Sequence, residues 1–211
     1  MQNYPRYKEF KDVFLFDLDQ FLDSVKYSML IHSTDMDDSS EIELYSPYNM
    51  QIVMFLDMDL MCSPSFDKKE LGKIRPVFLE VQNALHMAHV INTFPREIEE
   101  LDFSSPAISI GLRDGLIDRE SVFTNPRETK ESLDELIPSL MKRGEYNIQK
   151  IDDYADSINS IDIKEFNKRV RKIYNKFLKR PPYWTDSKNS TYNQELINSD
   201  NTGGAIKWVR M

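Results

Sequence analysis

The residues of this sequence whose types and spacing could do chemistry together are His89, Thr93 and Glu97, which recur at intervals of four. On an α-helix, residues four apart are rotated by about 40°, so the three share one face over roughly 12 Å. Neighbours such as Val81 and Val90 are apolar, which indicates a helix packed on most sides. A divalent cation held by a hydroxyl, a carboxylate and a third donor would give such a buried polar stripe a partner. The alternative is three ordinary solvated or hydrogen-bonded side chains.

The run from His89 to Glu97 resembles the second metal motif of class I terpenoid synthases, which reads Asn or Asp, then Ser or Thr, then Glu, at intervals of four. The acidic, Ser-rich segment 99–105 and the upstream segments 41–50 and 55–61 also resemble this family, so the resemblance covers about residues 45–115.

The resemblance implies a helical bundle, a Mg²⁺ or Mn²⁺ site at His89, Thr93 and Glu97, and metal-dependent ionisation of a prenyl diphosphate. The diphosphate-binding side chain would be Arg96, the residue we assign, or Lys73, an alternative that the sequence leaves open.

Two features depart from the family pattern. The first ligand position holds His89 where the family has Asn or Asp, and an imidazole nitrogen suits Zn, Fe or Mn better than Mg. Pro95 lies inside the motif and removes the helical hydrogen bond to the carbonyl of Ile91, which predicts a kink that could displace Glu97. An altered or lost metal site is therefore an alternative.

An acidic segment upstream has the composition of a metal-binding motif but not the position expected for it. Asp37, Asp38 and Glu41 match the aspartate-rich DDxxE pattern that holds diphosphate-bound metal in the same family. In that family the motif lies on a long helix much further upstream, whereas only 48 residues separate Glu41 from His89. Because Ser39 and Ser40 suit a loop or a helix N-cap, we interpret this segment as a solvated acidic loop, with the metal motif as the alternative.

The short upstream segment bears on whether the chain could catalyse alone. Only 88 residues precede His89, so we expect the helices that would close half of the pocket to be missing, which leaves an apolar seam. The seam could be covered by a separate amino-terminal-half chain or by a homodimer, or the chain could be a truncated product without activity. The rival hypothesis is a non-catalytic all-α interaction or subunit protein, whose acidic surface and Met-rich helices bind a partner helix.

Composition sets the fold class and excludes some partners. With only 6 Gly in 211 residues and many Leu, Met, Lys and Glu, the sequence predicts an all-α fold. Residues 1–105 carry nine Lys and Arg against nineteen Asp and Glu, and an acidic half argues against nucleic-acid binding. We find no apolar run long enough to span a membrane and no secretory signal, so we expect a cytoplasmic protein. Cys62, the single cysteine, is predicted to be a small core residue.

Helix periodicity and capping signals divide the chain into six or seven helices, with the His89 helix near the centre of the bundle. We predict one all-α domain over residues 1–184 and a polar, poorly ordered tail over 185–211. A capping box at Asp67 and Glu70 opens the His89 helix, and Asp162 caps the last helix. The other expected helices span residues 5–32, 46–62, 106–116, 125–142 and 145–160, the last as a surface helix.

Overall fold

The computed structural model describes residues 4–34 and 39–179, and within them the chain forms only helices and their connections, without a strand. The predicted all-α fold is confirmed. The proposed tail, residues 185–211, lies outside the described residues, as do Asp37 and Asp38 of the acidic motif.

The helices follow one another with short connections. The α-helices are α1 (Tyr7–Thr34), α2 (Ser39–Tyr45), α3 (Ile52–Cys62), α4 (Leu71–Glu99), α5 (Pro106–Arg113), α6 (Arg119–Thr124), α7 (Pro126–Leu133), α8 (Ile137–Asp152) and α9 (Ile163–Leu178). Three short 3₁₀ helices, η1 (Ser46–Met50), η2 (Lys68–Glu70) and η3 (Asp134–Leu136), link some of them.

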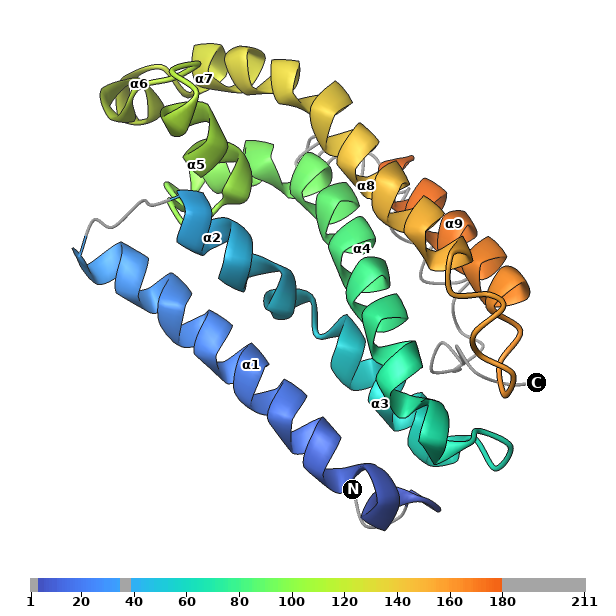
Figure 1. Cartoon of the computed structure of the whole chain (residues 1–211). Coiled ribbons are helices and arrows are strands. Elements are labelled where there is room, and N and C mark those ends of the chain that lie inside the picture. Colours follow the sequence, from blue (N-terminus) through green and yellow to red (C-terminus); the bar gives the residue numbers. More distant parts are fainter. Residues whose placement is uncertain (1–3, 35–38, 180–211) are drawn as a thin grey trace, which may run out of the picture.

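The long helix α4 runs through the middle of the molecule, with α1, α2 and α3 on one side and α8 and α9 on the other (Figure 1). Its first half contributes Phe78 and Val81 to an apolar cluster shared with α1, α3 and α9. Its second half contributes Val90 and Phe94 to another cluster, shared with α2, α5 and α8. Because α4 belongs to both clusters, it is the element on which the other helices pack.

The capping signals are confirmed in part. The Asp162 carboxylate accepts a hydrogen bond from the amide of Glu165 at 3.0 Å and so caps α9, as predicted. Asp67 likewise accepts from the amide of Lys69 at 2.9 Å. The expected capping box is wrong, because Glu70 turns away and accepts from the amides of Asn159 and Ser160, both at 2.9 Å. These bonds, together with the Ser160 hydroxyl, lower the pKa of Glu70 to about 2 and tie the loop before α9 to the start of α4.

Several predicted boundaries differ from the structure. The expected helix 46–62 is interrupted at Gln51, whose φ of 57° separates η1 from α3. The expected helices 125–142 and 145–160 are wrong, since the chain breaks at η3 and α8 then continues to Asp152. α8 is therefore no surface helix but the main neighbour of α4. Cys62, predicted to be buried, is exposed at the last position of α3.

None of the helices that the structure describes has the length and apolar character that crossing a membrane would require.

The close contact of α8 with α9 generates the first testable prediction. A Cβ at Gly144 would lie 2.5 Å from the hydroxyl oxygen of Tyr174 and 2.8 Å from its ring carbon Cε2. We expect Gly144→Ala to destabilise the protein by about 1–3 kcal/mol, because a buried ring on α9 must move. Thermal unfolding should show a melting temperature lower by roughly 2–4 °C per kcal/mol.

Gly72→Ala is the matched control, because a Cβ at Gly72 on α4 would meet no heavy atom within 4 Å. That change should leave stability unaltered or raise it by about 0.5–1 kcal/mol. Equal losses from both substitutions would contradict the packing described for Gly144.

Candidate functional site

The face of α4 that carries the predicted metal residues is longer than the sequence analysis recognised. At 100° per residue, six polar residues fall within about 80° of one another along the helix. We call them the α4 polar stripe, which consists of Arg75, Gln82, His86, His89, Thr93 and Glu97. Four are buried, with exposed fractions of 1 % for Gln82 and Thr93, 4 % for His86 and 8 % for Glu97, and the other two are partly buried. A polar stripe that faces the interior of the bundle needs polar partners from the neighbouring helices.

The predicted metal residues remain on one face, because α4 continues through Pro95 to Glu99. The Thr93 hydroxyl donates to the carbonyl of His89 in its own helix at 3.0 Å. Burial raises the pKa of Glu97, and the neighbouring Ser105 and Thr93 hydroxyls oppose that shift. Even so, the Glu97 oxygen Oε2 and the Ser105 hydroxyl are buried without a hydrogen-bond partner among the described residues.

These unpaired oxygens bear on the expected cation. Carboxylate and hydroxyl oxygens from Glu97, Thr93 and Ser105 suit Mg²⁺ or Mn²⁺, whereas burial and the nearby Arg96 lower the pKa of His89 and keep its imidazole neutral. The sequence analysis did not assign Ser105 to the metal site, and its place beside Glu97 comes from the turn between α4 and α5. In the part of the chain that the structure describes, no three His, Cys, Asp or Glu side chains cluster to hold a metal. The metal site therefore stays a prediction.

The two candidates for the diphosphate-binding residue lie far apart. Arg96 is partly exposed, forms an ion pair with Glu100 at 3.4 Å and lies close enough to affect His89. Lys73 lies 24 residues before Glu97, about 36 Å along α4, and donates to the carbonyl of Ser157 at 2.9 Å. Of the two, only Arg96 is near the predicted metal residues.

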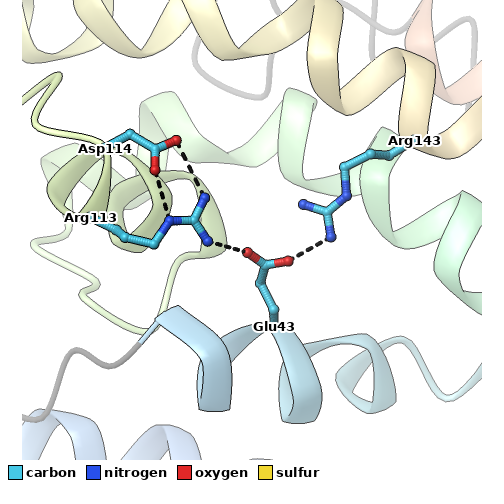
Figure 2. Close-up of polar contacts among 4 residues, drawn as sticks. All are labelled: Glu43, Arg113, Asp114 and Arg143. Atoms are coloured by element: carbon cyan, nitrogen blue, oxygen red, sulfur yellow. Dashed lines mark hydrogen bonds and ion pairs between the residues drawn. The ribbon is translucent and has the colours of Figure 1, made fainter.

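Two arginines, which the sequence analysis missed, converge on the carboxylate of Glu43 (Figure 2). Arg113 from α5 donates to one carboxylate oxygen of Glu43 at 3.0 Å, and Arg143 from α8 donates to the other at 2.6 Å. The Nε atom of Arg113 also donates a hydrogen bond to Oδ1 of the adjacent Asp114 at 2.8 Å, which fixes the guanidinium group. We call Arg113 and Arg143 the arginine pair. Two guanidinium groups from separate helices that bracket one carboxylate are arranged as they would be around a phosphate.

Of the arginine pair, Arg143 lies close enough to the polar stripe to affect His86. Burial, with smaller contributions from His89 and Arg143, lowers the pKa of His86 to about 3. The imidazole is therefore neutral, and its Nδ1 atom has no hydrogen-bond partner among the residues described.

The other end of the stripe forms a buried ionic cluster. Arg75 makes two hydrogen bonds to the Asp17 carboxylate, at 2.6 and 2.8 Å, and its Nη1 atom lies 3.8 Å from Asp57. Asp57 is completely buried. Neither of its oxygens has a hydrogen-bond partner in the described structure. Burial is the largest cause that raises the pKa of Asp57 to about 8, and the adjacent Asp17 is the second, although Arg75 opposes the shift.

Glu41 is the one acidic-motif residue whose side chain can be placed. It lies in the first turn of α2, not in a loop, and its carboxylate accepts a hydrogen bond from the Tyr27 hydroxyl at 2.9 Å. That carboxylate therefore helps to hold α2 against α1.

No family model matches this chain, and searches of characterised proteins and of solved structures found no match either. The resemblance to class I terpenoid synthases therefore rests on the motif residues alone.

The Asp57 cluster generates a prediction about pH. A carboxyl group whose pKa is about 8 in the folded protein, against 3.8 ordinarily, keeps a proton that the unfolded chain has lost. We expect the free energy of unfolding to fall as pH rises through this range. Asp57→Asn should abolish the part of this pH dependence that Asp57 causes. Near pH 8 the variant should be more stable than wild type by about 1–3 kcal/mol. Urea unfolding at about pH 5 and about pH 8 measures both values.

Asp59→Asn on the same helix is the control, because Asp59 is only partly buried and should keep the wild-type pH dependence. If Asp57→Asn retained the full pH dependence, Asp57 would be ionised in the folded protein.

Proposed function

We propose that this protein is a cytoplasmic, terpenoid synthase-like protein that binds a prenyl diphosphate, with the arginine pair as the anion-binding element. The observation that carries the proposal is the convergence of Arg113 and Arg143 on a single carboxylate beside the α4 polar stripe. Glu43 occupies the place that a phosphate would take. The half-exposed guanidinium groups, at 48 % and 47 % side-chain exposure, can be reached from solvent.

The proposed substrate class follows from the combination of this pair with the apolar surroundings. A diphosphate needs several cationic donors, and a prenyl chain needs apolar walls. Residues of the second apolar cluster, among them Ile42, Ile110 and Leu140, come from the same helices as the arginine pair and its carboxylate. A divalent ion held by Glu97, Thr93 and Ser105, with His89 adjacent, would supply charge stabilisation for the departing diphosphate. A second chain, either another copy or one that carries an aspartate-rich motif, is part of this proposal.

The rival proposal is a non-catalytic helical subunit or interaction protein, and a specific observation supports it. Large apolar side chains of α1, including Leu22 at 43 % and Met29 at 67 %, are exposed on the outer side of the helix. Monomeric proteins rarely leave such side chains in one continuous row.

The anion-binding prediction uses substitutions with opposite expected effects. By isothermal calorimetry with inorganic diphosphate and with farnesyl diphosphate, Arg113→Gln and Arg143→Gln should each weaken binding by about tenfold, since each removes one charge-assisted contact. Glu43→Gln should strengthen binding, because it removes the carboxylate that competes for both guanidinium groups. Arg127→Gln is the control, as that side chain is 91 % exposed and pairs with Glu131 within α7.

A purely structural arginine pair gives a different result. In that case wild type binds neither diphosphate, and Glu43→Gln lowers only the melting temperature, since α2 loses its ties to α5 and α8.

The metal prediction concerns the other end of the proposed site. If a cation binds together with diphosphate, His89→Asn should shift the preference from Mn²⁺ toward Mg²⁺ by offering another oxygen ligand. Glu97→Gln should abolish metal-dependent binding with either residue at position 89, because Glu97 supplies the only carboxylate. Thermal-shift measurements with each ion, with and without diphosphate, are the readout. The absence of any stabilisation that requires ion and diphosphate together would contradict this part of the proposal.

A further inference from the structure

The helix α1 carries two separate stripes. The inward stripe includes Phe10, Phe14 and Ile31, which are buried against the rest of the molecule. A second stripe, which we call the outer stripe, is centred about 110° away around the helix. It consists of Leu15, Leu18, Leu22, Val25 and Met29. Four of these side chains are exposed, at 41 % for Leu15, 43 % for Leu22, 38 % for Val25 and 67 % for Met29.

The spacing of the outer stripe is that of a coiled-coil seam. Its residues follow at intervals of three, four, three and four, so Leu15, Leu22 and Met29 occupy heptad position a, and Leu18 and Val25 occupy position d. A helix that only packs on its own globular core has a broader face with a period of 3.6 residues. A narrow, strictly heptad row on a second face indicates contact with another helix.

The charged residues beside the outer stripe indicate which partner helix is complementary to it. Asp19 and Lys26 follow the two d residues by one position, and both are exposed. In an antiparallel pair, these e positions face the e positions of the partner helix. With Leu22 opposite Val25 of the second copy, and Leu18 opposite its Met29, Asp19 comes beside Lys26 of the second copy. The two-fold axis repeats this ion pair, so the surface is complementary to itself.

A parallel pair lacks this complementarity. Each e position would then face the residue before an a position, and those residues are Phe14, Phe21 and Ser28, none of which is charged.

We propose that the outer stripe of α1 is the interface of an antiparallel homodimer of this chain. The sequence suggested a second copy as one way to cover an apolar seam, and the structure assigns that role to specific residues. The proposal is independent of diphosphate binding, because the arginine pair lies on α5 and α8 and not on α1.

Sedimentation velocity of the full chain at micromolar concentration tests the apolar part. We expect a wild-type dimer and a Leu22→Glu monomer, since each dimer would otherwise bury two carboxylates at its centre. Leu22 is exposed in the monomer, so the variant should keep its helical circular dichroism. Tyr146→Glu on α8 is the control, because Tyr146 is 55 % exposed and distant in sequence from α1, and this variant should remain a dimer.

Charge exchange tests the identity and direction of the partner. Asp19→Lys and Lys26→Asp should each weaken the dimer by about tenfold, because each creates two like-charge contacts. The double variant, Asp19→Lys with Lys26→Asp, should recover the wild-type dimer. Lys26 also pairs with Asp23 in its own helix, at 2.9 Å, and Asp23→Asn therefore serves as the control for that local contact.

Three outcomes would overturn the proposal: a wild-type monomer, a dimer that persists in Leu22→Glu, or a double charge variant no stronger than the single variants. None of them depends on whether the protein binds diphosphate.

Discussion

The burial of α4 on nearly all of its sides is the constraint from which the rest of the structure follows. A helix in the middle of a bundle must match each neighbour with a face of suitable chemistry, and α4 does so with apolar residues toward both clusters. Its remaining face is polar over most of its length. Every group on that face loses water on folding, so each one needs a partner or costs free energy.

The polar stripe meets this constraint differently at its two ends. Near the start of α4, Arg75 has its guanidinium group in a two-bond contact with Asp17, although the same cluster leaves Asp57 without a hydrogen bond. Near the other end, His86, Glu97 and Ser105 each keep an unpaired polar atom. Unsatisfied buried groups are uncommon in folded proteins. In the proposed function, the unpaired oxygens of Glu97 and Ser105 mark the place where a ligand would restore the missing contacts.

The surface of the molecule adds a second, separate feature. The arginine pair gathers two positive charges from helices that are adjacent only in the folded chain, while the overall charge of the protein is −8. In the proposed function, this pair would select anions that fit between its donors, because the surrounding carboxylates repel other anions. The outer stripe lies on α1 and not on the helices of the arginine pair. Its role in the further proposal is to bury apolar surface against a second copy.

The sequence by itself determined the helical class, the cap at Asp162 and the shared face of His89, Thr93 and Glu97, because these depend on local periodicity and on hydrogen bonds within a few residues. The same periodicity would have extended the stripe to Arg75 and His86. Only the tertiary structure decided that Glu70 binds residues 159 and 160, that Asp57 is buried beside Asp17, and that Glu43 meets Arg113 and Arg143. Those partners are separated by 40 to 100 positions, and no local rule connects side chains whose proximity arises from the packing of whole helices.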